Sequence, residues 1–229
     1  MEQLPWYVTA IFIGTIILAT WLFVKATHYS RMTLMLTSGW TCLQIILGIS
    51  GFYRDPASLA GRFPLLVVPP IIILVSLFVT RKGRSFIDGL DLPALTIFHI
   101  IRLPVEITLL FLFINHTIPK AMTIEGRNYD ILSGLSAPIL YYLVFIKKDL
   151  GKPVLIIWNF VCIGLLLNVV IHAVLSLPGR SVGFGFEQPN IAVGHLPYIL
   201  LPALIVPMAL FCNAAAIMQL LRQKSKEDH

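Results

Sequence analysis

The sequence of 229 residues predicts an all-α membrane protein, folded as one transmembrane domain (residues 1–229) with a seven-helix bundle. Of the residues, 57% are hydrophobic and only 12% are charged, which is about half the charge of a soluble domain. The apolar residues form long runs rather than amphipathic stripes, and seven of these runs approach the roughly 20 residues that cross a bilayer. Too little polar sequence remains to cover a soluble core of buried helices.

The expected spans follow one another closely, at residues 6–25, 33–52, 63–80, 92–116, 131–146, 153–176 and 196–221. The first begins with Trp6 and Tyr7, a position typical of interfacial aromatic residues. The segment before it, MEQLP, lacks the basic residues of a cleavable signal peptide, so we expect this helix to be retained. The second span ends before Tyr53, and the third ends before a basic cluster that starts at Arg81.

The last three spans are also delimited by their flanking residues. The fifth is the shortest, so we expect its helix to begin within the preceding loop. The sixth follows Lys152, and the seventh ends before Arg222. The longest connections, residues 119–130 and 177–195, precede the fifth and seventh spans.

The distribution of basic residues predicts the orientation of the bundle. Eleven basic residues fall on one predicted side: Lys25, Arg31, Arg81, Lys82, Arg84, Lys147, Lys148, Lys152, Arg222, Lys224 and Lys226. Five fall on the other: Arg54, Arg62, Lys120, Arg127 and Arg180. The positive-inside rule places the richer side in the cytoplasm, with the N-terminus outside and the C-terminus inside. The net charge of +6 then follows from topology and lipid headgroups, and it does not indicate a nucleic-acid partner.

A faint internal repeat relates the third and seventh spans, FPLLVVPPIIILVSLF and LPYILLPALIVPMALF. Two prolines and a phenylalanine recur with the same spacing: Pro64, Pro69 and Phe78, then Pro197, Pro202 and Phe211. The pattern would divide the chain into a three-plus-one-plus-three parallel repeat, an arrangement found in secondary transporters. The alternative is chance, since proline and leucine are common in membrane helices.

The fourth span, LPALTIFHIIRLPVEITLLFLFINH, carries three ionisable residues at membrane depth: His99, Arg102 and Glu106. They fall within about 60° of arc on one helix face. Charges at this depth are costly, so they usually mark a partner, a cavity or a solute path. One hypothesis assigns Glu106 as a proton or cation acceptor, Arg102 as an anion clamp and His99 as a titrating relay.

The alternative is a structural ion pair between Arg102 and Glu106, one turn apart, that fixes this helix in the bundle. Pro104 lies between them and leaves the carbonyl of Ile100 without its helical donor. Under either hypothesis, the polar face predicts that the fourth span packs at the centre of the bundle.

Polar residues elsewhere are weaker candidates. Asn168 and His172 share a face of the sixth span and are candidates for binding the solute or ion. The outer loop into the fifth span, MTIEGRNYDILSGLSAP, is rich in hydrogen-bonding side chains, with Glu125, Arg127 and Asp130 as binding candidates. Asp130 also has a simpler explanation, as the N-cap of the fifth helix.

A metal site is a further hypothesis with little support. Its weak candidates are His116, His172 and His195, all expected near the outer surface, because neutral imidazole with carboxylate suits zinc or copper. No HxxxH or HExxH pair is present. The three cysteines, Cys42, Cys162 and Cys212, all fall within spans and indicate no disulfide framework.

The outer-loop stretch, together with WNFVCIGLLLN and EQPNIAV, resembles a set of polytopic bacterial membrane proteins with no known activity. The resemblance covers most of the chain and implies a multi-pass location in the bacterial inner membrane. It implies no site residues.

The function that these features favour is a transporter or channel-like protein that binds a small solute or ion in a polar cavity around the fourth span. The alternatives are a seven-helix ligand-binding sensor or interaction protein and, with less support, an intramembrane metal-dependent enzyme. The expected partners are the lipid bilayer and the solute, and the oligomeric state is open. No cofactor is expected, and covalent retinal is excluded because the last span has no lysine before Lys224.

Overall fold

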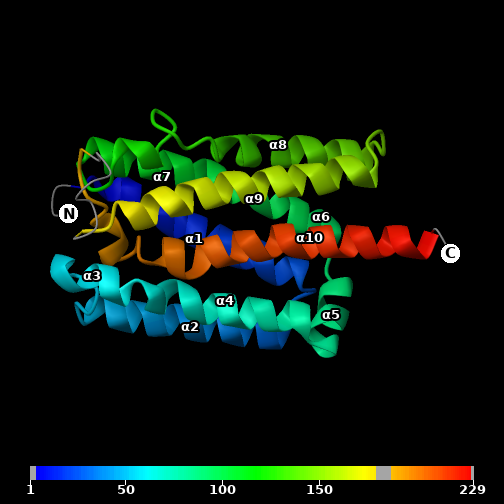
Figure 1. The fold of residues 1–229 in the computed structure, drawn as a ribbon, viewed down its shortest axis with the longest axis horizontal. Coiled ribbons are helices and arrows are strands. Elements are labelled where there is room, and N and C mark those ends of the chain that lie inside the picture. Colours follow the sequence, from blue (N-terminus) through cyan, green and yellow to red (C-terminus); the bar gives the residue numbers. More distant parts are fainter. Residues whose placement is uncertain (1–3, 179–186, 228–229) are drawn as a thin grey trace.

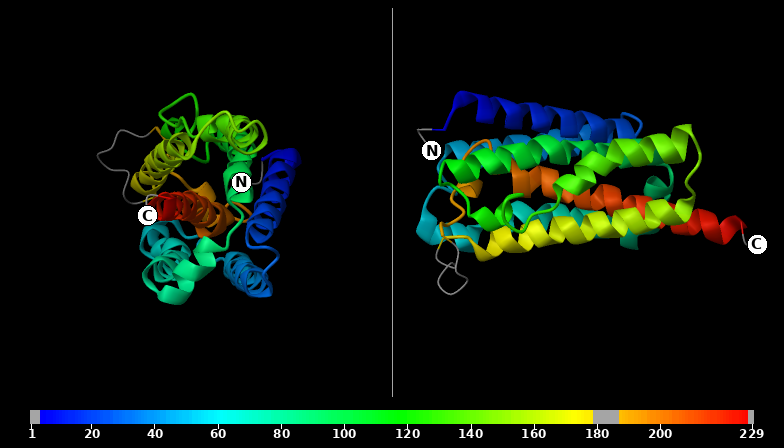
Figure 2. Two further views of the ribbon diagram at one scale, coloured as in Figure 1. Left: turned by 90° about the vertical axis from the view of Figure 1, so that its right-hand side faces the viewer. Right: turned by 90° about the horizontal axis from the view of Figure 1, so that it is seen from above.

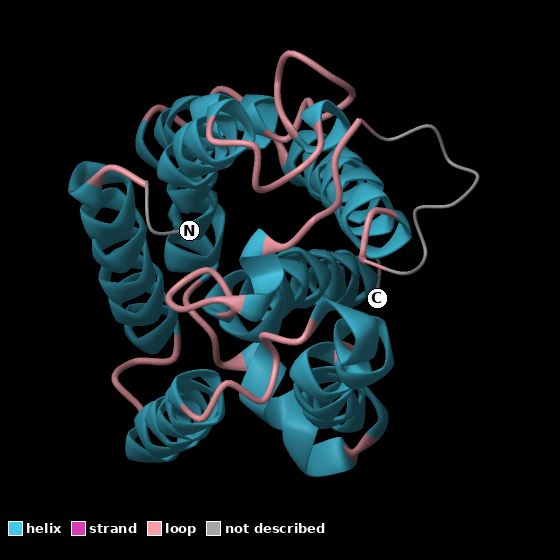
Figure 3. Cartoon of the chain, turned by 90° about the vertical axis from the view of Figure 1, so that its left-hand side faces the viewer, coloured by secondary structure: helices cyan, strands magenta, loops and turns pink. Residues whose placement is uncertain are grey.

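The computed structural model describes residues 4–178 and 187–227, and this part of the chain forms helices and loops without strands. The long helices run roughly along one axis, and neighbours in sequence alternate in direction (Figure 1). The two ends of the chain lie at opposite ends of the bundle. Figure 3 views the bundle from the end that holds the N-terminus, where several connecting loops also lie.

Six helical segments of the described residues are long and apolar enough to cross a membrane. They are α1 (Trp6–Ala26), α2 (Arg31–Ile49), α3 with α4 (Pro56–Arg62 and Pro64–Val79), α6 to α7 (Leu92–Ile97, Phe98–Ile101 as η1, and Arg102–Ile114), α9 (Lys152–Leu175), and η5 with α10 (Leu201–Ile205 and Val206–Glu227). The expected fifth span is a shorter apolar helix, α8 (Ile131–Tyr141) continued by η3 (Tyr142–Ile146). Composition therefore located every long helix, while several ends moved.

Two of the moved ends have clear local causes. The third span begins earlier than expected, because Asp55 accepts a hydrogen bond from the N–H of Ala57 at 3.1 Å and Pro56 opens α3. The last span begins later, at Leu201, because residues 192–200 form a short turn of helix, η4 (Ala192–Gly194), and a loop. Two prolines, Pro197 and Pro202, flank this change and lack the N–H that a regular helix needs.

The basic cluster after α4 is a helix rather than a plain loop. This helix, α5 (Arg81–Asp88), begins at Thr80, whose Oγ1 accepts a hydrogen bond from the N–H of Gly83 at 3.1 Å. Gly83 lies so close to the backbone of Leu77 that a Cβ atom there would overlap it. The glycine thus permits the sharp bend between α4 and α5.

The last helix, not the fourth span, occupies the centre of the bundle. Within the span Leu201–Arg222, 72% of the residues compared are buried, against 50% for Leu92–Ile114. In the end-on view the orange-red α10 lies in the middle, with the other long helices around it (Figure 2). The expectation of a central fourth span was wrong, because small buried side chains such as Ala215 and Ala216 let neighbours pack around α10 more closely.

Side-chain hydrogen bonds to backbone carbonyls hold the central helix to its neighbours. The indole N–H of Trp40 donates to the carbonyl of Ala203 at 2.8 Å. Pro207, four residues later, has no backbone N–H and cannot donate a hydrogen bond to this carbonyl. Near the other end, Gln219 donates from Nε2 to the carbonyls of Ile87 and Leu90 at 2.5 and 2.9 Å. Both polar contacts lie within the bundle, where an unpaired backbone group would be costly.

Candidate functional site

The fourth span changes its helical form where its polar residues lie. Between α6 and α7, the four residues Phe98–Ile101 form a turn of 3-10 helix, η1. Pro104 follows within one turn and cannot donate to the carbonyl of Ile100, so a regular helix is interrupted here. His99, Arg102 and Glu106 extend from this irregular region and are exposed by only 0%, 3% and 2%. The side chains are therefore buried inside the protein and do not face lipid.

Arg102 forms a buried ion pair with Asp130 at the start of α8. Its Nη1 also lies 3.4 Å from the hydroxyl of Ser133 and 3.3 Å from the carbonyl of Cys162 on α9. The ion pair of Arg102 with Glu106, one of the two alternatives that the sequence offered, is thus replaced by an ion pair with Asp130. Asp130 occupies the N-cap position of α8, but its carboxylate accepts from Arg102 and from Ser133 rather than from a backbone N–H of the helix.

Glu106 contacts an amide instead of a cation. Both of its carboxylate oxygens lie 2.7 Å from Nδ2 of Asn128, which also lies 3.0 Å from the carbonyl of Met122. The orientation of the amide is fixed, because Oδ1 of Asn128 accepts from the N–H of Asp130 at 2.9 Å. Two amide hydrogens thus face three acceptor oxygens, so Glu106 is less well stabilised as an anion than Asp130 is.

The loop between α7 and α8, residues 115–130, reaches these residues because it folds back along the bundle. Helix α8 begins part-way along the bundle rather than at its end (Figure 1). Gly126 and Gly134 allow this course: a Cβ atom at Gly126 would overlap the backbone of Lys120, and one at Gly134 would lie 3.0 Å from the N atom of Leu103. The short fifth helix and the polar loop are thus two aspects of one arrangement.

His99 lies one turn before Arg102 and has aromatic neighbours. Its ring centroid is 5.5 Å from that of Trp158 on α9 and 5.7 Å from that of Phe98, in edge-to-face geometry. The indole N–H of Trp158 donates to the hydroxyl of Ser136 on α8 at 2.8 Å. Neither ring nitrogen of His99 has a hydrogen-bond partner among the described residues.

Other buried polar atoms also lack partners within the described part of the chain. They include Nε and Nη2 of Arg102, Oδ1 of Asn159 on α9, and both amide atoms of Asn213 on α10. Buried polar groups are normally hydrogen-bonded, to protein or to water. These atoms lie on α7, α9 and α10, of which α9 and α10 pack against each other, and their burial without hydrogen bonds is unfavourable.

We call the residues that these contacts join the buried polar column. Its members come from η1, α7, the loop before α8, α8 and α9: His99, Arg102, Glu106, Asn128, Asp130, Ser133, Ser136, Trp158 and Cys162. Four of these residues were candidates from the sequence: His99, Arg102, Glu106 and Asp130. Asn128 and Ser133 were not predicted as hydrogen-bond partners of Glu106 and Arg102, although both belong to the polar stretch before and within α8.

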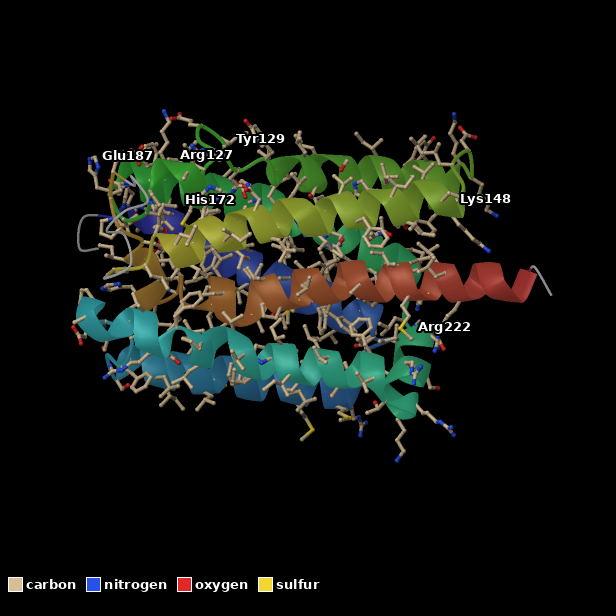
Figure 4. All side chains as sticks on the ribbon, in the orientation of Figure 1. Arg127, Tyr129, Lys148, His172, Glu187 and Arg222 are labelled. Atoms are coloured by element: carbon tan, nitrogen blue, oxygen red, sulfur yellow. The ribbon has the colours of Figure 1, made fainter. Side chains whose placement is uncertain are left out.

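The remaining candidates lie outside the column. Asn168 donates from Nδ2 to the carbonyl of Arg127 at 2.6 Å, and the Nδ1 atom of His172 lies 2.8 Å from the carbonyl of Asn168. Figure 4 shows Arg127 and His172 nearer the N-terminal end of the bundle. The side chains of Glu125 and Arg127 are exposed.

The histidines suggested as metal ligands have separate partners. Nδ1 of His116 lies 3.1 Å from Oε1 of Gln188, and Nδ1 of His195 lies 3.0 Å from the carbonyl of Ile191. Within residues 4–178 and 187–227, no three side chains of histidine, cysteine, aspartate or glutamate are grouped as metal ligands would be. The structure therefore does not bring His116, His172 and His195 together.

A family model described as "Domain of unknown function (DUF8737)" matches residues 63–221. The chain belongs to this family. The matched part of this DUF8737 protein contains the whole buried polar column, whereas α1, α2 and α3 precede it. No curated protein and no solved structure matches the chain.

Proposed function

We propose that this protein is a seven-span membrane transporter that moves a small solute or ion, with Glu106 as the group that exchanges a proton or cation. The proposal rests on one observation: the buried polar column contains two carboxylates and one guanidinium, and the guanidinium pairs with Asp130. Among the described residues, the hydrogen-bond partner of the Glu106 carboxylate is the amide of Asn128, not a cation. An ionised Glu106 would therefore add a buried charge without a counter-ion.

Such a carboxylate is stable when it carries a proton or when a cation binds beside it. This is the property that coupling requires, because the energy of the site then depends on whether a proton or cation is present. A purely structural pair would contain equal numbers of positive and negative groups. The column does not, and this favours the transport proposal over a structural role for the fourth span.

The closed form of the site also supports the proposal. His99, Arg102 and Glu106 are all nearly inaccessible to solvent. A transporter that alternates between two sides of a membrane passes through a form in which its site is shut from both. Discontinuous helices around such sites are typical, and here η1, η5 and the late start of α8 interrupt three of the surrounding helices.

In this proposal, α8 with η3 also crosses the membrane, as the fifth of seven spans. Its residues Ile131–Ile146 would extend roughly 24 Å as an α-helix, somewhat less than the bilayer core. It suffices because its N-terminal end lies within the protein, next to Arg102, rather than at the lipid surface. The N-terminus would face outward and the C-terminus the cytoplasm, in accordance with the positive-inside rule.

The test is uptake into liposomes that contain the purified protein. With a pH gradient imposed, we would measure the accumulation of radiolabelled acetate, phosphate, alanine and sodium ion. The Glu106→Gln variant keeps the shape of the side chain but cannot release a proton. We expect the wild type to accumulate at least one probe and Glu106→Gln to do so at least about tenfold more slowly, since removing a positioned proton acceptor typically costs 10²–10⁴-fold in rate.

Glu125→Gln is the matched control, because the Glu125 side chain is exposed in the outer loop. We expect this variant to transport at the wild-type rate. Equal, gradient-driven uptake by Glu106→Gln and wild type would remove the coupling role. A wild type that accumulates none of the four probes, while binding a ligand, would favour the sensor alternative.

A further inference from the structure

We infer that the free edge of Arg102, together with the ring of His99, is a receptor for the carboxylate group of a ligand. This inference rests on the proposed function and specifies the class of ligand that it carries. It assigns separate roles to the charged residues of the column: Arg102 binds the anionic group, Asp130 orients Arg102, and Glu106 carries the coupling proton or cation.

The first argument is the planar geometry of the guanidinium group. Nη1 of Arg102 is directed at Asp130, Ser133 and the carbonyl of Cys162, which lie on α8 and α9. In a planar guanidinium, the Nε–Nη2 edge points away from Nη1. Nε and Nη2 are the two atoms of Arg102 without partners among the described residues. The contacts of Nη1 therefore fix the position of the guanidinium, and its Nε–Nη2 edge remains available to a ligand.

This edge presents two parallel N–H donors, and two parallel acceptor oxygens on one planar group match them. A carboxylate is such a group, and bidentate pairing of arginine with carboxylate is both strong and geometrically specific. Asp130 already neutralises Arg102, so a bound carboxylate adds one net negative charge to the column. A proton on Glu106 prevents a second uncompensated charge, so carboxylate binding and protonation of Glu106 favour each other.

His99 supplies a further donor or acceptor on the same helix face, one turn away. Its ring is held between Trp158 and Phe98 by edge-to-face contacts, and both ring nitrogens lack partners among the described residues. Its side chain is fully buried. A histidine whose only role was packing would not need two nitrogen atoms, whose burial without hydrogen bonds is unfavourable.

The carboxylate has two possible sources: a small solute in water or a fatty acid in the membrane. For the solute, equilibrium dialysis of radiolabelled acetate would measure the dissociation constant of the protein in lipid nanodiscs. For the fatty acid, thermal unfolding with laurate and with dodecanol would be compared, because the two differ only in the head group. Inorganic phosphate and chloride would serve as competing anions at equal ionic strength.

Two variants test the residues separately. Arg102→Lys retains the positive charge for Asp130 but has no bidentate edge, and we expect it to bind the carboxylate roughly 10- to 100-fold more weakly, the equivalent of one or two charge-assisted hydrogen bonds. His99→Phe keeps an aromatic ring between Phe98 and Trp158, so it retains the packing and loses both nitrogens. We expect it to weaken binding severalfold. The control is Arg127→Lys, an exposed arginine of the outer loop, which should bind as the wild type does.

The inference is overturned if the wild type binds neither acetate nor laurate, or if both site variants bind as tightly as the wild type. Tighter binding of phosphate than of acetate would also overturn it, because a tetrahedral anion would then be preferred. If Arg102→Lys fails to fold, His99→Phe alone decides. These measurements require no transport, so carboxylate binding can fail while coupling through Glu106 stands, and unchanged uptake by Glu106→Gln would leave the binding result intact.

Discussion

At the scale of single residues, the buried polar column depends on a contact between two residues that are far apart in the sequence, Arg102 and Asp130. His99, Arg102 and Glu106 are conspicuous because ionisable groups are rare in apolar spans. Their spacing within one helix favours an intrahelical pair of Arg102 with Glu106. The actual partner, Asp130, is 28 residues further along the chain and reaches Arg102 through the fold of the outer loop. Helical periodicity gives no information about how the loop brings Asp130 to Arg102.

The pairing predicts the effect of removing one partner. We expect Asp130→Asn to lower the free energy of unfolding by about 3–5 kcal/mol, because Arg102 would be left buried without a counter-charge. The measurement is unfolding of the purified protein in detergent, by titration with a denaturing detergent. Glu125→Gln, an exposed acidic residue in the same loop, should change stability by less than about 0.5 kcal/mol.

A double variant separates charge from packing at the same site. Replacing both partners, as Arg102→Met with Asp130→Leu, should recover most of the stability lost in Asp130→Asn, because no buried charge remains. A double variant as unstable as Asp130→Asn would show that the shape of this pair, rather than its charge, stabilises the start of α8.

At the scale of helices, the position of the column depends on the close approach of α8 to the fourth span. Gly134 makes this approach possible, since a Cβ atom there would lie 3.0 Å from both the N atom and the Cγ atom of Leu103. Small residues at such crossings are common in membrane helices, because packing there has no hydrophobic driving force. Asp130 and Ser133 precede Gly134 by one turn and one residue, so a shift of α8 would move both away from Arg102.

A matched pair of glycine variants tests this dependence. We expect Gly134→Val to lower stability by about 1–3 kcal/mol, the usual cost of overpacking, and to weaken any ligand binding at Arg102. Gly164→Val introduces the same side chain on α9, where nothing lies within 4 Å of a Cβ atom, and should change stability much less. Detergent unfolding and acetate dialysis are the measurements. Equal losses in both variants would mean that the helical propensity of valine, rather than the contact, is responsible.

Hydropathy alone predicted the positions of the long helices but not the irregular turns within them. Apolar runs placed every long helix, because a membrane span requires a minimum length of apolar sequence. They did not indicate η1, η5 or η3, since these depend on how prolines and neighbouring side chains share backbone hydrogen bonds. The polar composition of residues 122–138 singled out the loop that contacts Arg102 and Glu106, but which residues make these contacts depends on the course of the loop in three dimensions.

At the scale of the whole molecule, the spans are arranged around α10 rather than around the fourth span. The fourth span holds the charges, while α10 has the larger buried share. A polar face therefore indicates a helix that borders the interior, and burial on all sides indicates the helix that occupies it. The suggested three-plus-one-plus-three repeat stays a prediction, and so does the orientation in the membrane.

The orientation leads to a direct test with two residues that lie toward opposite ends of the bundle, Arg127 and Lys148 (Figure 4). In a background with the three cysteines, Cys42, Cys162 and Cys212, replaced by serine, single Arg127→Cys and Lys148→Cys variants would be treated with a membrane-impermeant maleimide. In spheroplasts we expect Arg127→Cys to be labelled at least about tenfold faster, because the end rich in lysine and arginine stays in the cytoplasm.

Permeabilised membranes provide the control, where both cysteines should react, since the Arg127 side chain and that of Lys148 are exposed. Faster labelling of Lys148→Cys in intact spheroplasts would reverse the orientation. The loop that carries Asn128 and Asp130 would then lie on the cytoplasmic side of the buried polar column. A transporter of the proposed kind opens its site to each side in turn, so this reversal would exchange the two sides of the site without changing the direction of the gradient that drives uptake. The labelling result thus determines which side of the membrane a solute reaches when it leaves the column past this loop.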